Sequence, residues 1–102
     1  NSNTSNNSSD NYGGGVYGSN VTLSIENTAF TSNTVKTTGS SQNAYGGGLS
    51  VQSGTVTLAD SVTFTGNNAL QTGGGSTFGQ QYYIKKGTTF NGAVLTEDKK
   101  VD

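Results

Sequence analysis

The feature that most constrains this chain is a glycine-rich motif that recurs along it. The sequence YGGGV at residues 12–16 returns as YGGGL at residues 45–49, and a third triplet, TGGGS, occupies residues 72–76. A phenylalanine follows each triplet after a nearly constant interval. A recurring unit of about 20–50 residues is typical of architectures in which each unit stacks on the next. We therefore predict three repeat units, near residues 12–44, 45–71 and 72–96.

Glycine marks the start of each predicted unit, and phenylalanine lies near its end. The repeat positions are Gly13, Gly14, Gly15, Gly46, Gly47, Gly48, Gly73, Gly74 and Gly75, followed by Phe30, Phe64 and Phe90. Glycine permits a backbone corner with positive φ and a close approach between neighbouring units. Asn33 and Asn67 stand three residues after the first two phenylalanines. For them we predict either a turn or a ladder of inward amides.

Apolar residues between these landmarks alternate with polar ones. Val21, Leu23 and Ile25 are separated by single polar residues, and VTL at residues 56–58 and VTF at residues 62–64 repeat the pattern. A period of two predicts short strands with one buried face, and no stretch shows the spacing of an amphipathic helix. The predicted fold class is all-β, as a parallel β-helix of about three rungs.

Stacked rungs place equivalent residues in ladders. We expect one internal ladder from the three phenylalanines and another from Val16 and Leu49, the residues that follow the first two triplets. In the third unit, Tyr82 and Ile84 are aligned with Val56 and Leu58 of the second. Such a core needs only one inward residue in two, which suits a chain in which Leu, Ile, Val and Phe make up 19 of 102 residues.

Composition argues against several functions. The chain has no Cys and no His, so it lacks thiolate chemistry and the commonest general base and metal ligand. It has five lysines without an arginine and no apolar run of membrane-spanning length, so we expect neither nucleic-acid binding nor a span in this segment. Glu26 and Asp60 occupy equivalent turns, about 5 Å apart if the strands are neighbours, and are read as solvated turn residues. We predict a non-enzymatic chain without catalytic residues, bound metal or cofactor.

Polar segments mark the predicted boundaries. Residues 1–11 contain no apolar side chain, and we predict a flexible connector or a loop there. Residues 37–43 are interpreted as a polar insert that lengthens the first interval between units. Residues 97–102 are predicted to be a charged tail at which the ordered region, residues 12–98, ends. Because the chain begins at Asn1 rather than at Met, we expect it to be a piece of a longer protein.

The glycine triplets combined with FTSN at residues 30–33 and FTGN at residues 64–67 resemble the repeats of the chlamydial polymorphic membrane proteins. That family repeats Gly-Gly-Ala-Ile/Leu/Val and Phe-x-x-Asn, and Gly15 and Gly48 stand where it usually has Ala. The resemblance covers residues 12–93. It implies an autotransporter passenger, a right-handed parallel β-helix carried to the cell surface by a β-barrel, that acts as an adhesin toward a host-cell receptor.

Three non-enzymatic functions are therefore considered, all extracellular or at the cell surface. The first is the adhesin-like passenger segment that the resemblance implies. The second is a glycosylated fibre or coat, in which other copies of the chain stack head to tail. Its N-glycosylation acceptors in the sequence are Asn3, Asn6, Asn7 and Asn20. The third and least favoured is ice binding by outward threonines of residues 55–57 and 63–65, which Tyr83 and Lys85 would interrupt in the third rung.

Overall fold

The computed structural model describes residues 2–5, 10–39 and 42–102, and within them the chain is all-β. The predicted fold class is confirmed at that level. No helix in these residues is long and apolar enough to cross a membrane. The strands are β1 (Ser2–Ser5), β2 (Asn11–Tyr12), β3 (Val16–Gly18), β4 (Val21–Ile25), β5 (Ala29–Thr31), β6 (Thr34–Thr37), β7 (Ala44–Tyr45), β8 (Leu49–Val51), β9 (Gly54–Leu58), β10 (Thr63–Thr65), β11 (Asn68–Gln71), β12 (Thr77–Phe78), β13 (Tyr82–Ile84), β14 (Thr89–Phe90), β15 (Ala93–Val94) and β16 (Lys99–Val101).

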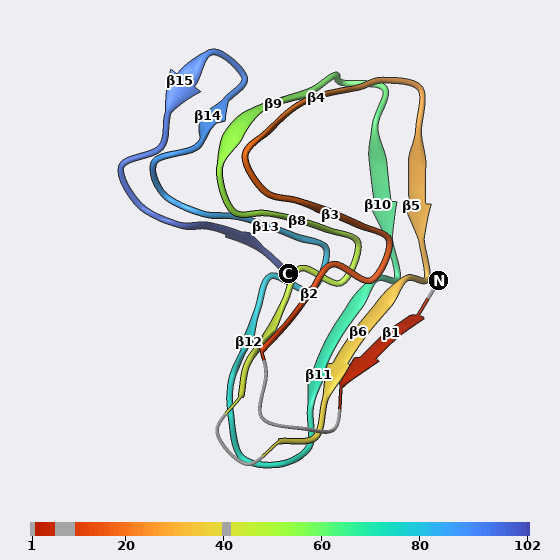
Figure 1. Cartoon of the computed structure of the whole chain (residues 1–102). Coiled ribbons are helices and arrows are strands. Elements are labelled where there is room, and N and C mark those ends of the chain that lie inside the picture. The colour runs from red at the N-terminus through yellow and green to blue at the C-terminus, as the bar shows by residue number, and fades with distance from the viewer. Residues whose placement is uncertain (1, 6–9, 40–41) are drawn as a thin grey trace.

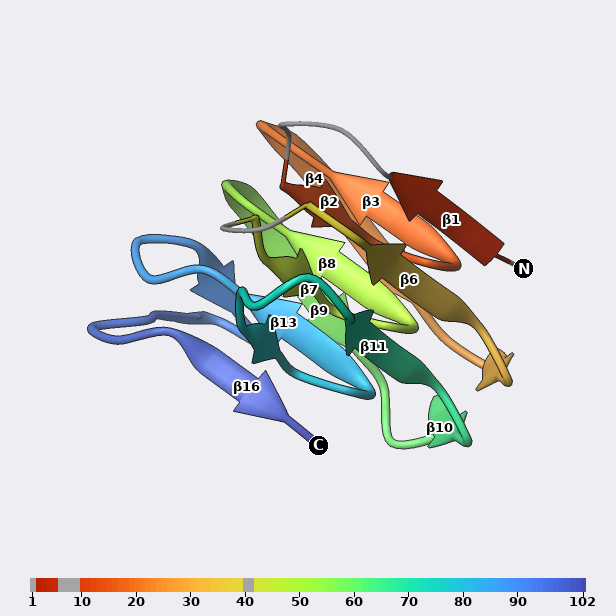
Figure 2. The ribbon, with the colours of Figure 1, turned by 90° about the horizontal axis from the view of Figure 1, so that it is seen from below.

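The strands form five small sheets whose members come from successive passes of the chain. The sheets are β1-β6-β11, β5-β10, β2-β7-β12, β3-β8-β13-β16 and β4-β9-β14-β15. We call β2–β6 the first pass, β7–β11 the second and β12–β14 the third; Figure 2 shows them side by side. Partners in the first two passes run parallel and are separated by an almost constant interval along the chain. Only β13–β16 and β14–β15 are antiparallel among the described strands.

Each of the first two passes traces a two-lobed outline with a narrow waist (Figure 1). The large lobe is enclosed by β3, β4 and β5 and their partners, and the small lobe by β2 and β6 and theirs. Because successive side chains of a strand point to opposite faces, the alternating pattern places its apolar members inside. Buried residues of the large lobe are Phe30, Leu49, Val51, Val56 and Ile84. Those of the small lobe are Val35, Ala44 and Ala69.

The third pass begins later than the sequence predicts. Phe78 of β12 lies opposite Tyr45 of β7, which lies opposite Tyr12 of β2, so the two intervals between these residues are equal. The segment FGQQY at residues 78–82 therefore takes the place of the glycine motif in this pass. The TGGGS segment at residues 72–76 lies between β11 and β12 instead.

This register corrects the predicted third unit at residues 72–96. Gly73, Gly74 and Gly75 are not equivalent to the first two triplets, because they belong to the turn that ends the second pass. The insert predicted for residues 37–43 is likewise wrong for its described part, since Thr37 lies opposite Gln71 and Ala44 opposite Thr77, so a turn of similar length follows one pass later. The glycine-rich turn at residues 72–76 has a sequence similar to the repeat motif but a different position in the fold.

The phenylalanine ladder has two members rather than three. Phe30 and Phe64 lie opposite each other in β5 and β10, with ring centroids 4.8 Å apart and planes 6° apart. Phe90 lies opposite Val56 instead, because the third pass turns back before it reaches the position of β10. Its place on Phe64 is taken by Tyr82, whose ring centroid lies 4.7 Å from that of Phe64.

The predicted alignment of Tyr82 and Ile84 is also wrong. These residues lie opposite Leu49 and Val51 of β8, not opposite the apolar pair of β9. Tyr82 therefore continues the column that starts with Val16 after the first triplet, and Ile84 continues the column of Gly18 and Val51.

Both predicted polar ends contain strands. Residues 2–5 form β1, which pairs in parallel with β6, and Asn11 belongs to β2, so the connector predicted for residues 1–11 is wrong for these residues. Residues 99–101 form β16, which runs antiparallel along β13. Order thus continues through the stretch predicted to be a charged tail, residues 97–102. Backbone pairing requires no apolar side chain, and the composition of these segments therefore hid the strands.

Candidate functional site

The waist of the outline brings the glycine motif against the segment that follows each phenylalanine. A Cβ atom added to Gly14 would lie 2.6 Å from the carbonyl oxygen of Thr34, and one added to Gly47 would lie 2.5 Å from the backbone nitrogen of Asn68. Real Cβ atoms do not approach backbone atoms so closely. The middle glycine is therefore required because two stretches of backbone pass each other there.

Asn33 and Asn67 fill the waist from the other side. The Oδ1 atom of Asn67 accepts hydrogen bonds from the backbone N–H and the side-chain amide of Asn33, both at 3.0 Å. Its Nδ2 atom donates to the carbonyl oxygen of Phe30 at 2.8 Å. Both asparagines are buried, and a Cβ at Gly15 or Gly48 would lie 3.1 Å from the Cγ of the nearer asparagine. The two amides form a ladder that links the first pass to the second.

Two glutamines end this ladder in the third pass. Gln81 stands where Gly48 stands one pass earlier, and its Oε1 accepts a hydrogen bond from Nδ2 of Asn67 at 2.8 Å. Gln80 stands in the position of Gly47, and its Oε1 accepts from the backbone N–H of Ala69 at 2.8 Å. The side chains thus satisfy groups of the second pass where no further strand lies beside β11 among the described residues. Their equivalence to glycines could not be seen in the sequence, because the triplet at residues 73–75 resembles the repeat motif more closely than residues 79–81 do.

A column of aromatic rings runs outside the waist. Tyr12, Tyr45 and Phe78 stack with centroids 4.8 and 5.0 Å apart. Tyr17 and Tyr83 flank the column from the next sheet, at 5.4 Å from Tyr12 and 4.9 Å from Tyr45 respectively. The stacked rings cover each other's faces, and the hydroxyl of Tyr45 accepts a hydrogen bond from Nδ2 of Asn43 at 3.2 Å. The tyrosine before each of the first two triplets was the available sequence signal for this column.

Three tyrosines of this region and of the large lobe hold their protons more tightly than usual. Burial raises the pKa of Tyr83, and the nearby carboxylate of Asp98 raises it further, partly by accepting a hydrogen bond from the hydroxyl. Burial and the charge of Asp10 raise the pKa of Tyr12, and burial raises that of Tyr82. These three hydroxyls are therefore neutral at physiological pH.

Outward hydroxyls form a second regular column. Thr22, Thr55 and Thr89 lie opposite one another in β4, β9 and β14, and Ser24 lies opposite Thr57 in the first two. Successive members of such a column are separated by the strand spacing of about 4.8 Å. The expected interruption by Tyr83 and Lys85 does not occur here, because both lie in or just after β13, in a different sheet.

The four predicted glycosylation acceptors have different positions. Asn20 is exposed in the turn between β3 and β4, with φ of 56° and its backbone N–H bonded to Oγ of Ser53 at 2.7 Å. Asn3 lies in β1, opposite Val35. Asn6 and Asn7 lie outside the described residues.

The acidic side chains do not converge. Glu26 and Asp60 lie exposed in corresponding turns after β4 and β9. The part of the chain that the structure describes contains no group of three or more His, Cys, Asp or Glu residues placed to hold a metal ion.

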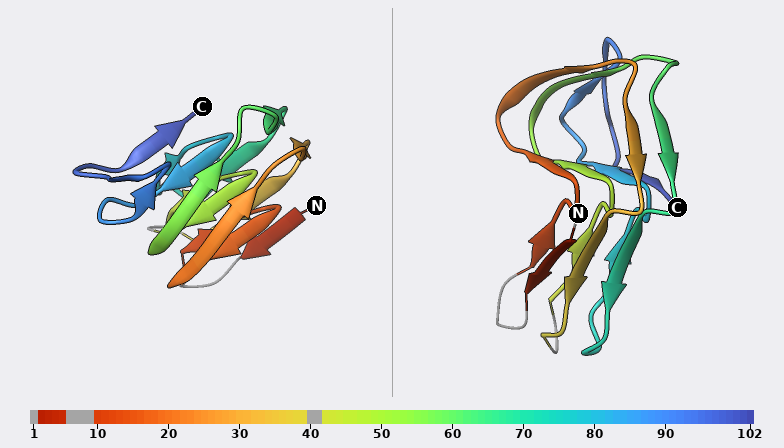
Figure 3. Two further views of the ribbon diagram at one scale, coloured as in Figure 1. Left: turned by 90° about the horizontal axis from the view of Figure 1, so that it is seen from above. Right: turned by 90° about the vertical axis from the view of Figure 1, so that its right-hand side faces the viewer.

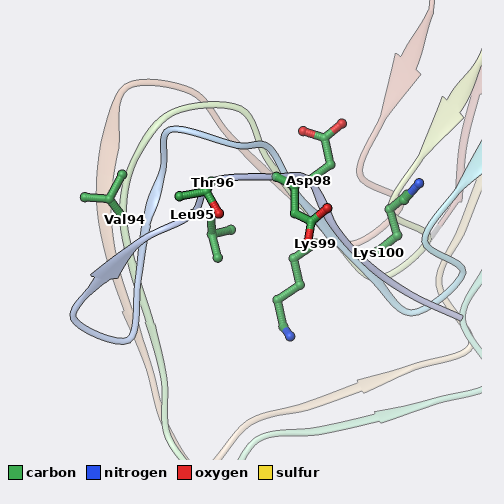
Figure 4. Close-up of a pocket in the computed structure, with 7 residues that line it drawn as sticks. Val94, Leu95, Thr96, Asp98, Lys99 and Lys100 are labelled. Carbon is green, nitrogen blue, oxygen red and sulfur yellow. The ribbon is translucent and has the colours of Figure 1, made fainter.

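The C-terminal strands close one end of the large lobe. Figure 4 shows that Leu95 and Lys99 point to the same side of this segment, whereas Lys100 points to the other. Leu95 packs against the large-lobe core. The Nζ atom of Lys99 lies 5.4 Å from the ring centre of Phe90, and that of Lys100 lies 5.6 Å from that of Phe78. Lys99 thus covers the ring of Phe90 in the large lobe, and Lys100 covers Phe78, the last ring of the outer column.

Comparison of the chain with protein-family profiles, with curated proteins and with solved structures gives no match.

Proposed function

We propose that the chain is a segment of a right-handed parallel β-helix that serves as the non-catalytic, adhesin-like passenger of an extracellular or cell-surface protein. The observation that carries the architecture is the pairing of like residues across passes, such as Phe30 with Phe64 and Asn33 with Asn67. Parallel strands joined by crossovers are right-handed in nearly every known case, which gives the handedness. The recurring glycine motif and the resemblance to the chlamydial repeats support the surface role.

Within this proposal, the repeat sets the spacing of the strands, and the residues that point outward make the contacts. Inward and waist positions are dictated by stacking, whereas outward positions such as Tyr17, 49% exposed, are not. The partner would be a host-cell receptor or another copy of the chain, met at the exposed ring of Tyr17 beside the outer aromatic column. Aromatic side chains that are partly apolar and partly polar are enriched in protein interfaces.

Attachment to cells tests the adhesin role. Beads coated with the chain are expected to bind cultured cells more than beads coated with an unrelated β protein of the same net charge. A Tyr17→Ser variant should bind more weakly, while a Thr57→Ser variant, changed on another sheet, should bind as the parent does. Equal binding by coated and control beads would refute the role and leave the architecture untouched.

Ice binding is a second candidate, favoured by the uninterrupted threonine column of Thr22, Thr55 and Thr89. A droplet freezing assay with a Thr55→Leu variant tests it, since a flat hydroxyl array is needed. Absence of thermal hysteresis in the parent chain eliminates this candidate. The fibre alternative is less favoured, because β16 and β15 cover the edges of β13 and β14, two of the edges on which the next copy would have to stack head to tail.

A further inference from the structure

The hairpin that joins β14 to β15 turns on an exposed Asn-Gly pair. Asn91 and Gly92 have φ of 48° and 87°, and both are exposed. They connect Phe90 to Ala93, which lie opposite each other in the two antiparallel strands. A two-residue hairpin loop with positive φ at both positions is a type I′ turn, for which Asn-Gly is a preferred sequence. Figure 1 shows this turn at the upper left, outside the outline of the large lobe.

The residue after Asn91 distinguishes it from two asparagines in a similar setting. Asn20 and Asn27 are also exposed and have φ of 56° and 49°. They are followed by a valine and a threonine, whose branched side chains crowd their own backbone nitrogens. Asn91 is followed by glycine in the only Asn-Gly pair of the sequence, and a Cβ atom added to Gly92 would meet nothing within 4 Å. The nitrogen of Gly92 is therefore the least hindered of the three for an approach to the preceding side chain.

The side-chain carbonyl of Asn91 is also polarised by a hydrogen bond. Its Oδ1 atom accepts from the backbone N–H of Leu58 in β9 at 2.8 Å. A donor at a carbonyl oxygen stabilises the negative charge that develops there when a nucleophile adds to the carbon. The N–H of Leu58 therefore stands in the position of an oxyanion donor for attack on Cγ of Asn91.

We propose that Asn91 is a site of spontaneous deamidation, through a cyclic imide formed with Gly92. The nitrogen of Gly92 loses its proton to a base in the solvent and bonds to Cγ of Asn91. The Cγ–Nδ2 bond breaks, and Nδ2 takes a proton from the solvent and leaves as ammonia. Water then opens the ring at either carbonyl and gives aspartate or isoaspartate, with no oxidation or reduction. The proposal does not depend on the adhesin role.

The isoaspartate product would alter the hairpin. Its main chain runs through the β-carbon, so the two-residue loop gains a methylene group and no longer fits the type I′ geometry. The new carboxylate also adds a negative charge to a hollow that Asn91 lines together with Asp60 and Lys99. Conversion should therefore loosen the pairing of β14 with β15 and take the acceptor away from the N–H of Leu58.

Peptide mapping of the aged chain tests the proposal. The chain is incubated near neutral pH, digested with trypsin and analysed by mass spectrometry for the conversion of amide to acid. The tryptic peptide of residues 87–99 contains no asparagine except Asn91 and no glutamine. Conversion there is expected to be at least tenfold faster than at Asn20 or Asn27. Gly92→Ala should slow it at least tenfold, whereas Gly87→Ala, at φ of 89° and in equally open space, should change it by less than twofold.

Two comparisons complete the test. The free peptide of residues 87–99 should convert no more than tenfold faster than the folded chain, because the hydrogen bond from Leu58 assists the reaction in the fold. In the isoaspartate form, isolated by chromatography, exchange of the Leu58 N–H should be at least tenfold faster than in the parent. Equal rates at the three asparagines overturn the proposal, as does an unchanged rate in a folded Gly92→Ala variant. A folded chain that converts far more slowly than the peptide overturns the role of Leu58, and unchanged Leu58 exchange overturns the effect on the hairpin.

Discussion

Replacing Asn67 with alanine tests whether the waist holds the passes together. Asn67 is 4% exposed. Its side chain joins Asn33, Phe30 and Gln81 through four hydrogen bonds of 2.8 to 3.0 Å. Alanine deprives the backbone N–H of Asn33 and the carbonyl of Phe30 of this partner. A buried group that loses its partner costs about 1–3 kcal/mol, so the free energy of unfolding should fall by about 2–4 kcal/mol.

Urea-induced unfolding followed by far-UV circular dichroism measures this loss. The midpoint should fall at an unchanged m value, and the melting temperature should drop by on the order of 10–20 °C for a domain of this size. The exposed Thr57 provides the control, since Thr57→Ala should change the free energy by less than about 0.5 kcal/mol. A loss that small for Asn67→Ala would refute the argument that the amide ladder stabilises the stack.

Replacing Asn67 with aspartate tests which side-chain atom accepts a hydrogen bond and which donates one. Asn67→Asp keeps the acceptor for Asn33 but turns a carboxylate oxygen toward the carbonyl of Phe30. Burial and this contact disfavour the charged form, so the folded-state pKa of the new carboxyl should exceed its unfolded value. Stability of the variant should then fall as the pH rises above about 4. The same stability at pH 3.5 and pH 7, relative to the parent, would contradict the assigned direction of the amide.

Three further perturbations follow from the same geometry. Gly47→Ala should lower the free energy of unfolding by about 1–3 kcal/mol, because its Cβ would collide with the carbonyl oxygen of Gln80. Gly87→Ala, which has open space around it and φ of 89°, should lower it by about 1 kcal/mol through backbone strain alone. Equal losses for the two variants in urea unfolding would contradict the steric argument. The raised pKa of Tyr83 means that its contribution to stability is present below about pH 10 and lost above it, so a Tyr83→Phe variant should lose less stability between pH 9 and 11. Removal of residues 97–102 uncovers the edge of β13 and should produce dimers or larger species in light scattering, and a monomeric product of unchanged stability would count against a capping role.

The repeat and the strand pattern could be predicted because they are governed by local rules. An alternation of period two fixes which side chains point inward, and a motif that returns at a regular interval fixes which of them meet. Phe30 opposite Phe64 and Asn33 bonded to Asn67 are both direct consequences of the interval in the first two units.

The third pass could not be predicted in the same way, because its motif had changed. Only Gly79 of the segment at residues 78–82 retains the glycine of the earlier motifs, with φ of 72°, as Gly13 and Gly46 have φ of 66° and 63°. This first glycine is needed for the left-handed turn in every pass. The equal spacing of Tyr12, Tyr45 and Phe78 was a better guide than the number of glycines, since ring stacking continues while the glycines do not.

The strands at the two ends of the chain could not be predicted for a related reason. Figure 3 shows β16 running along the C-terminal side of the stack, although its sequence is KKV. Charged residues are common on edge strands because they discourage further pairing. Sequence patterns based on apolar alternation identify strands that build a core, and they overlook strands that only pair or cover.

The exchange of glycine for glutamine explains both the repeat and its interruption. At Gly47 the backbone of Asn68 passes so closely that no side chain fits. In the third pass the chain turns back before it forms a counterpart of that stretch, which leaves space beside Gln80. A glutamine there can reach the N–H of Ala69, a group that a further strand would otherwise bond. The residue that is forbidden inside the stack therefore becomes useful where the stack is incomplete, and the glycine motif marks the presence of the second backbone rather than a binding site.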